Sequence, residues 1–268
     1  MIQVGEVTIG SGRPKICASI TETTRKAIIA AADILMQRSI DIVEWRIDFY
    51  EEVDQWEQVQ ETLQRLKMSL AGKPLLVTFR TAAEGGNREI SMEEYKTLLT
   101  KVADSRCAQM VDVEVFKEIS YEERIDMERN TQNQERLDCF IDWIEGLREK
   151  VVVIGSYHDF DKTPCDEELY ARMDMIAETG VDIPKMAVMP QNKMDVLRLM
   201  TFTLEESEKL EKPLITMSMG KIGSISRMMG EAFGSAITFG SAGQTSAPGQ
   251  IAVNRLDQVL DIIHQNYQ

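Results

Sequence analysis

Short runs of β-branched and other apolar residues alternate along the chain with longer segments whose apolar residues recur every three or four positions. The short runs predict strands and the longer segments predict helices, a pattern typical of repeated βα units and a parallel sheet. Successive runs begin roughly 22 to 41 residues apart, which suits one strand and one helix per unit. The predicted strands are Lys15–Ile20, Ile42–Ile47, Leu75–Arg80, Met110–Val115, Val151–Tyr157, Ile183–Met189, Leu214–Ser218 and Ala236–Phe239.

Amphipathic helices are predicted between these strands. The clearest periodicity lies in Thr23–Gln37, Met92–Ala103, Asp166–Ala177 and Asn192–Leu210, and Ser91-Met-Glu-Glu supplies a capping box for the second of them. The charge-rich segment Glu118–Lys150 predicts one or two solvated helices. Before the first strand, Val4–Ile9 followed by Gly10-Ser-Gly predicts a small hairpin.

Eight βα units favour an α/β fold closed into a (β/α)8 TIM barrel over an open doubly wound sheet. An open sheet usually carries a glycine-rich first turn, and none follows Ile20. No low-complexity linker divides the chain, so residues 1–268 are predicted to form a single barrel domain. The N-terminal hairpin would close the bottom of that barrel.

Ionisable residues recur on one face of four predicted strands. Because side chains alternate along a strand, Val43 and Trp45 should point toward the helices while neighbouring charges point toward the barrel axis or its mouth. The residues placed on this inner face are Glu44, Arg46, Asp48, Thr78, Arg80, Asp112, Glu114, Lys185, Ala187 and Met189. One such charge alone is typical of a solvated strand end or a satisfied ion pair. Together they indicate an active site, because a parallel sheet is normally buried on both faces and an unpaired buried charge is costly.

Lys185 stands in Ile183-Pro-Lys-Met-Ala-Val-Met-Pro190, among almost entirely apolar neighbours. A lysine there either extends its ammonium group to solvent or works as an amine. Apolar surroundings, with Arg46 and Arg80 nearby, favour the uncharged amine, which attacks ketones and forms an imine.

His158 ends the fifth predicted strand in Gly155-Ser-Tyr-His-Asp-Phe160. A histidine bonded to its own loop is the simpler interpretation, but its place beside the lysine-bearing strand favours a proton shuttle. The glycine-rich stretch 217–227 fails the Walker pattern, yet a helix N-terminus with Arg227 suits a carboxylate or phosphate. The small-residue loop 241–250 is either an ordinary turn or a mobile lid.

The composition limits the classes of function. A net charge of −14 argues against nucleic acid or an anionic membrane as partner, so an anionic substrate would need local cations. No apolar run is long enough to span a bilayer, and the first residues lack the features of a signal peptide. Four scattered cysteines fit reduced thiols, and two histidines make a histidine-built metal site improbable. We therefore expect a cytoplasmic protein.

Nine short motifs, in order over nearly the whole chain, carry a resemblance to a known family. They are Glu44-Trp-Arg-Ile-Asp-Phe49, Thr78-Phe-Arg80, Asp112-Val-Glu114, Ser156-Tyr-His-Asp-Phe160, Pro184-Lys-Met-Ala-Val-Met-Pro190, Met217-Ser-Met219, Ile225-Ser-Arg227, Thr238-Phe-Gly240 and Ser246-Ala-Pro-Gly-Gln250. On these motifs the chain resembles the type I 3-dehydroquinate dehydratases, the Schiff-base enzymes of the shikimate pathway. It departs from the family in Glu118–Lys150, which looks longer than usual.

The resemblance implies a (β/α)8 barrel, commonly a homodimer, that dehydrates 3-dehydroquinate to 3-dehydroshikimate with no metal or cofactor. It implies that Lys185 forms the imine, that His158 is the general acid and base, and that Glu84 is a further catalytic carboxylate. The substrate-binding residues implied are Glu44, Arg46, Arg80, Arg227, Ser246, Gln250, Met217, Met219, Phe239 and Ala247. Asp112, Glu114 and Ser19 would support them.

Two alternatives stay open at this point. Another Schiff-base barrel lyase, such as a class I aldolase, would share Lys185 but cleave a carbon–carbon bond. A catalytically silent barrel would only bind a carboxylate ligand, although the complete set of ionisable residues argues against that interpretation.

Overall fold

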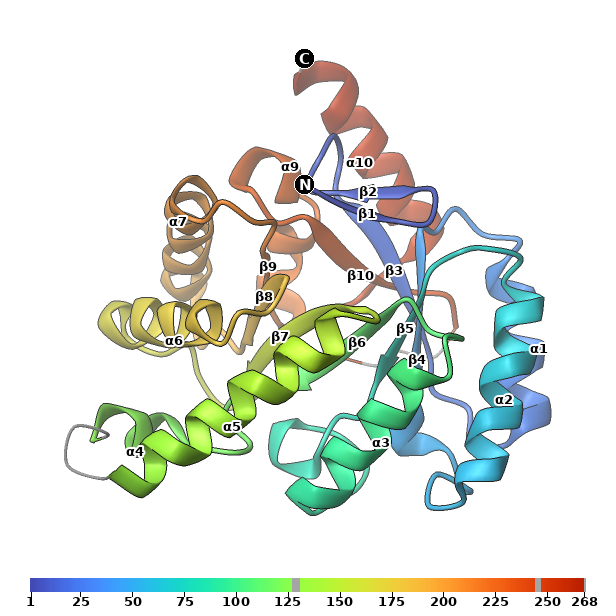
Figure 1. Ribbon diagram of the computed structural model, residues 1–268. Coiled ribbons are helices and arrows are strands. Elements are labelled where there is room, and N and C mark those ends of the chain that lie inside the picture. Colours follow the sequence, from blue (N-terminus) through green and yellow to red (C-terminus); the bar gives the residue numbers. More distant parts are fainter. Residues whose placement is uncertain (127–130, 244–246, 268) are drawn as a thin grey trace.

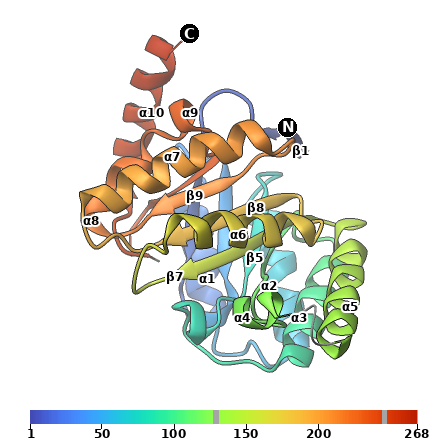
Figure 2. The same cartoon turned by 90° about the vertical axis from the view of Figure 1, so that its left-hand side faces the viewer.

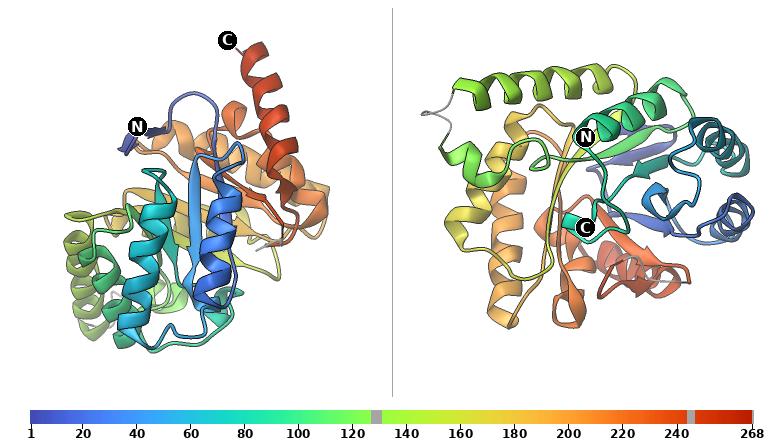
Figure 3. Two further views of the ribbon diagram at one scale, coloured as in Figure 1. Left: turned by 90° about the vertical axis from the view of Figure 1, so that its right-hand side faces the viewer. Right: turned by 90° about the horizontal axis from the view of Figure 1, so that it is seen from below.

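A parallel sheet curls into a barrel with helices around its outside (Figures 1 and 3). The computed structural model describes residues 1–126, 131–243 and 247–267. The barrel strands are β3 (Lys15–Ile20), β4 (Ile42–Arg46), β5 (Leu75–Thr78), β6 (Met110–Glu114), β7 (Val152–Asp159), β8 (Ile183–Val188), β9 (Ile215–Ser218) and β10 (Ile237–Ser241). The predicted strands and the predicted (β/α)8 barrel are confirmed.

Each barrel strand pairs in parallel with the next, from β3 to β9, and β10 returns to pair with β3. A bridge between Leu214 and Ser235 joins β9 to β10 at the amino-terminal edge. Farther along β10, the short strand β11 (Ile251–Ala252) pairs with Gly240 on the edge opposite β3. The chain after β10 therefore inserts into the seam between the last two barrel strands.

The helices occupy the outer layer, as Figure 2 shows for α6 and α7 against β8 and β9. They are α1 (Arg25–Leu35), α2 (Trp56–Ser69), α3 (Met92–Asp104), α4 (Tyr121–Ile125), α5 (Thr131–Arg148), α6 (Asp166–Glu178), α7 (Lys193–Lys209), α8 (Gly220–Gly223), α9 (Gly230–Phe233) and α10 (Val253–Tyr267). The predicted capping box of α3 is present, with Ser91 and Glu94 satisfying each other's backbone amides. Within the described residues, no helix has the length and apolar character needed to cross a membrane.

The segment 118–150 forms α4 and α5, in line with the prediction of one or two helices. It is less solvated than expected, because α5 buries Phe140, Ile144 and Leu147 and contacts β7. The charge-rich sequence hides this packing, since its apolar residues are spaced along a single face.

Two apolar layers confirm the predicted strand alternation. Val43, Trp45 and Val77 belong to the layer between the sheet and the helices. The barrel interior is a separate cluster built from strand residues such as Ile42 and Ile183. The strand residues between those of the outer layer therefore point toward the barrel axis, which is where the charged residues were predicted.

The N-terminal hairpin closes one end of the barrel. Its strands β1 (Ile2–Val4) and β2 (Val7–Ile9) pair antiparallel, and Val4 and Ile9 are buried in the interior cluster. That cluster contains the first inward residues of the barrel strands, so the hairpin covers their amino-terminal ends (Figure 1). The predicted bottom plug is confirmed, and the opposite end is left as the open mouth.

Candidate active site

A pocket opens at the carboxyl ends of the barrel strands, with about 470 Å³ of space not filled by protein atoms, mouth included. Its walls combine ionisable and apolar side chains. They are Glu44, Arg46, Thr78, Arg80, Glu84, Gly85, His158, Phe160, Lys185, Ala187, Met217, Met219, Phe239, Ala247 and Gln250.

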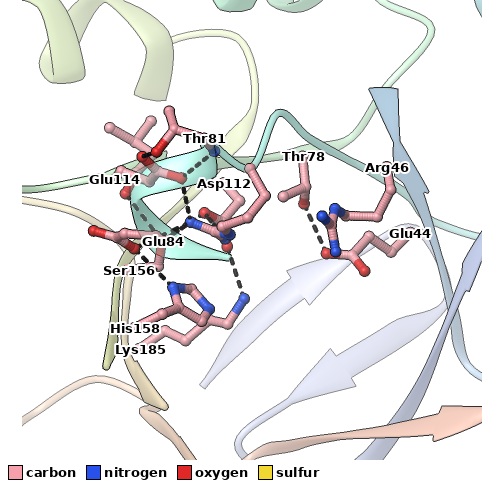
Figure 4. Close-up of polar contacts among 12 residues, drawn as sticks. Glu44, Arg46, Thr78, Thr81, Glu84, Asp112, Glu114, Ser156, His158 and Lys185 are labelled. Carbon is pink, nitrogen blue, oxygen red and sulfur yellow. Dashed lines mark hydrogen bonds and ion pairs between the residues drawn. The ribbon is translucent and has the colours of Figure 1, made fainter. Parts of the chain in front are cut away.

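Lys185 lies on the pocket wall with only 3% of its surface exposed. Its Nζ is 2.9 Å from Oδ2 of Asp112 and 4.8 Å from the centre of the Phe239 ring (Figure 4). The prediction of apolar and cationic surroundings overlooked this carboxylate, which accepts a hydrogen bond from the amino group. The amine must therefore lose its proton and leave Asp112 before it can act as a nucleophile.

His158 projects from the end of β7 on the strand next to Lys185. Its Nδ1 is 2.8 Å from Oε2 of Glu84, and both side chains are largely buried (Figure 4). Burial, with Arg80 and Lys185 nearby, holds the pKa of the His158 imidazole well below its ordinary value. Burial and the Glu114 carboxylate raise the pKa of Glu84 well above its ordinary value. The two side chains therefore hold a neutral pair, with the second imidazole nitrogen available for proton transfer.

Arg80, on the pocket wall, pairs with three acidic side chains. Its guanidinium lies 2.7 Å from Asp112, 2.9 Å from Glu114 and 3.4 Å from Glu84. Burial alone would lower the pKa of Arg80, but the carboxylates of Asp112 and Glu114 outweigh burial and raise that pKa. Burial would likewise raise the pKa of Asp112, yet Arg80 and Lys185 hold it well below its ordinary value. Asp112 is therefore a fixed anion and a poor proton acceptor.

The opposite wall presents Glu44 and Arg46 from β4. Oε1 of Glu44 accepts a hydrogen bond of 2.8 Å from Thr78, and its other oxygen accepts one from Ser19. Arg46 forms a two-point pair with Asp48, with both distances 2.8 Å. Each charged side chain is thus held by a neighbouring polar side chain, which leaves its remaining polar atoms for the pocket.

Arg227 differs from the other cations of the region. Its guanidinium donates to the carbonyl oxygens of Phe239 at 3.4 Å and Pro248 at 3.1 Å. Its Nε is buried without a partner, and burial lowers the pKa of the guanidinium to about 10. Within the described residues no carboxylate pairs with it. This arrangement leaves a buried positive charge unneutralised beside Met217 and Phe239 of the pocket wall.

Most of the residues predicted for the site line one pocket, but several do not. Arg227, Asp112, Glu114 and Ser19 lie behind the wall, in contact with residues that form it. Ser246 lies outside the described residues. In the described parts of the chain, no group of three or more histidine, cysteine, aspartate or glutamate side chains could hold a metal ion.

The pocket also contains residues absent from the predicted binding set. Thr78 and Ala187 follow from the strand alternation and could have been included. Gly85 and Phe160 could not, because their contact is made between distant loops. A Cβ added to Gly85 would lie 2.4 Å from the Phe160 ring, and the φ angle of Gly85 is +81°. Glycine is therefore needed where this aromatic wall closes on the loop.

Comparison with known proteins then decides the family. A family model described as type I 3-dehydroquinase matches residues 16–267. The chain belongs to this family. It is 41% identical to the 3-dehydroquinate dehydratase of Clostridioides difficile, over 99% of this chain and 98% of the relative. It is 42% identical to that of Listeria welshimeri, with 99% of both chains covered.

Solved structures agree with this membership. The crystal structure of type I 3-dehydroquinate dehydratase from Clostridium difficile with covalent modified comenic acid has a TM-score of 0.86 at 41% identity. That match covers 98% of this chain and 97% of the other. The 3-dehydroquinate dehydratase of Geobacillus kaustophilus has a TM-score of 0.87 at 35% identity, covering 100% and 97%. The resemblance inferred from the nine motifs is confirmed.

Proposed function

We propose that this protein dehydrates 3-dehydroquinate to 3-dehydroshikimate and water through an imine formed on Lys185. Membership of the type I family supports the reaction. The observation that carries the assignment of residues is a buried lysine that shares one pocket with the His158–Glu84 pair. A class I aldolase is not supported, because the family match covers nearly the whole chain.

Imine formation begins with deprotonation of the Lys185 ammonium. Asp112 is a poor acceptor because its pKa is depressed, whereas neutral His158 on the adjacent strand can take the proton. The free amine then attacks the substrate ketone and passes a proton to the carbonyl oxygen. His158 returns the proton it took from Lys185 to the same oxygen, which leaves as water. The resulting iminium is a stronger electron sink than the ketone, which lowers the barrier to removing the α proton.

Elimination follows on the bound iminium. The basic nitrogen of His158 removes the α proton, and the electron pair forms the ring double bond as the β hydroxyl leaves with a proton returned from His158. Glu84 holds the other ring nitrogen and keeps the imidazole oriented. Water then hydrolyses the imine, which releases 3-dehydroshikimate and restores the lysine.

The charges around the pocket fit this substrate. Arg227 has no anionic partner among the described residues, so we assign it the substrate carboxylate. Glu44, Arg46 and Arg80 would orient the hydroxyl groups, and Met217, Met219 and Phe239 would pack against the ring. Gln250, Ala247 and Ser246 belong to the loop that would close over it. Asp112, Glu114 and Ser19 would hold these side chains in place.

We extend the proposal to the setting of the enzyme. No cofactor enters the reaction as written, so activity should survive a metal chelator. Four free cysteines support a reducing, cytoplasmic compartment. Residues 1–268 would act as one barrel domain, and two copies would associate as a homodimer.

Borohydride reduction during turnover tests the imine directly. Hydride should reduce the iminium and leave the substrate carbon skeleton attached to the peptide that contains Lys185, detected by mass spectrometry. Lys185→Ala should abolish both the label and turnover while the far-UV circular dichroism stays unchanged. Lys193→Ala, at the exposed start of α7, is the matched control and should remain labelled at Lys185. Active enzyme with no label at Lys185 would end the imine proposal.

A further inference from the structure

The pairing of strand β5 with its neighbour β6 stops before β6 ends. The last paired residues are Thr78 and Asp112, whereas β6 continues to Glu114 and remains paired with β7 through Ser156. The backbone of Val115 bonds to Ser156 on the β7 side. Since alternate residues of a strand bond to opposite neighbours, the backbone groups of Asp112 and Glu114 face the side that β5 has left.

The hydroxyl of Tyr95 fills this gap from outside the barrel. It accepts a hydrogen bond of 3.0 Å from the backbone N–H of Glu114 and donates one of 3.3 Å to the backbone carbonyl of Asp112. If β5 were longer, its backbone would form hydrogen bonds with this donor and this acceptor. Tyr95 lies on α3, which contacts β6, so the helix supplies a substitute for the missing peptide group (Figure 1).

The early departure of β5 has a consequence for the site. It lets the chain turn across the end of β6, where the N–H and hydroxyl of Thr81 donate to Glu114 at 2.8 Å and 2.7 Å. Arg80, the residue before Thr81, pairs with both Asp112 and Glu114. Asp112 and Glu114, whose backbone groups bond to Tyr95, are therefore the same two residues whose carboxylates pair with Arg80. The carboxylate of Asp112 also pairs with Lys185.

We propose that Tyr95 is a positioning residue for the reaction, with its hydroxyl fixing the backbone of Asp112 and Glu114 and thereby the places of Arg80 and Lys185. The inference rests on the function proposed above. Tyr95 touches neither the pocket nor, by that function, the substrate, so it acts only through other residues.

The surroundings of Tyr95 suit a fixed hydroxyl. Its ring is fully buried and packs edge-on against Phe79, with centroids 6.2 Å apart, and beside Trp143 at 6.4 Å. Burial and the Glu114 carboxylate raise the pKa of this phenol well above its ordinary value. It therefore stays neutral and keeps both its donor and its acceptor at any pH where the enzyme works.

Tyr95→Phe tests the proposal because it removes the hydroxyl and keeps the ring. Loss of the two bonds should let the ends of β5 and β6 drift, so that Lys185 meets the ketone in a poorer geometry. We expect kcat and the rate of borohydride-trapped imine formation to fall by about tenfold to a hundredfold, with KM changed by less than about twofold. Replacement by 4-aminophenylalanine, whose amino group both donates and accepts, should restore most of kcat.

The matched control is Tyr50→Phe. Tyr50 is also buried against an aromatic ring, that of Trp45, and its hydroxyl bonds to Glu52 and Thr62 on the outer layer. Its loss should lower the melting temperature without changing kcat. Kinetics of Tyr95→Phe equal to those of Tyr50→Phe would overturn the inference.

A second measurement needs no variant. The Glu114 amide of the unmodified protein should exchange with deuterium as slowly as the other amides of β6, and rapid exchange would also overturn the inference. The unmodified enzyme in the same assay separates the two proposals. If it fails to convert 3-dehydroquinate, the proposed function is wrong, whereas an active enzyme insensitive to Tyr95→Phe refutes only the role of Tyr95.

Discussion

At the scale of single residues, the site is a set of buried charges that nearly balance. Arg80 and Lys185 face Asp112 and Glu114, and the neutral His158–Glu84 pair adds no net charge. Such balance is needed because a charge buried without a partner costs several kcal/mol. Arg227 is an exception to this charge balance, which is expected of a residue that binds an anionic substrate.

The depressed pKa of His158 predicts how activity depends on pH. A group whose pKa is lowered stays neutral as the pH falls through its ordinary value of about 6.5, so the imidazole remains a base there. We expect kcat/KM to hold its plateau below about pH 6.5 and to fall only at lower pH. Arg46 also lowers this pKa, so Arg46→Gln should move the acid limb upward. A wild-type midpoint at or above the ordinary histidine value would contradict the prediction.

Arg227 has no carboxylate partner among the described residues, which predicts a binding defect when it is replaced. Arg227→Gln should raise KM about hundredfold, a loss of about 3 kcal/mol, because the substrate carboxylate would lose its charged partner. Quinate, which has the carboxylate but no ketone, should raise the melting temperature of the wild type and not of the variant. Arg65→Gln, on an exposed pair of α2, is the control and should leave KM unchanged. An unchanged KM in Arg227→Gln would remove the residue from binding.

At the scale of elements, the alternation of side chains along each strand separates residues that stabilise the fold from residues that form the pocket. The outward residues of each strand pack against helices, while inward residues near the carboxyl end line the pocket. The hairpin β1–β2 serves only the opposite end, where Val4 and Ile9 cover the interior cluster. Elements at the two ends of the barrel should therefore respond differently to substitution.

Ile9→Ala tests this division. Removing three methyl or methylene groups from a fully buried position should lower the free energy of unfolding by about 3 kcal/mol. Because the hairpin lies away from the pocket, kcat and KM of the folded variant should match the wild type. Ile34→Ala, at an exposed position of α1, should change stability by less than about 0.5 kcal/mol. Denaturant titration measures the free energy of unfolding, and steady-state kinetics measures kcat and KM. Altered kinetics in Ile9→Ala would show that the two ends of the barrel are coupled.

At the scale of the whole molecule, the net charge of −14 coexists with a pocket whose walls carry Arg46, Arg80 and Lys185. An anionic substrate is therefore attracted by the cations of the pocket and not by the net charge of the protein. The outer surface carries another unusual feature, an apolar row along α7 formed by Met194, Leu197 and Leu204. The contacting helix α8 adds the exposed Ile222. A row of this kind is typical of an interface.

We predict that a second copy of the same chain covers this row, as the proposed homodimer requires. Lys193 is exposed at the start of the helix and Glu208 near its end, so two antiparallel copies would place opposite charges together. Sedimentation equilibrium should give the mass of a dimer, and Leu197→Glu should convert it to a monomer. Met68→Glu, at an isolated exposed position on α2, should remain dimeric. A dimeric Leu197→Glu would place the interface elsewhere.

The sequence by itself determined the barrel, the inner face of each strand and the choice of Lys185 and His158, because alternation and local composition are properties of neighbouring residues. Tertiary structure decided the partners. The amine of Lys185 meets Asp112 from 73 positions away, and His158 meets Glu84 from 74. It also decided that the Tyr95 hydroxyl bonds to the backbone of β6 and that, among the described residues, Arg227 has no anionic partner. Contacts of this kind depend on which side chains from distant strands meet inside the barrel, and local sequence patterns do not specify those meetings.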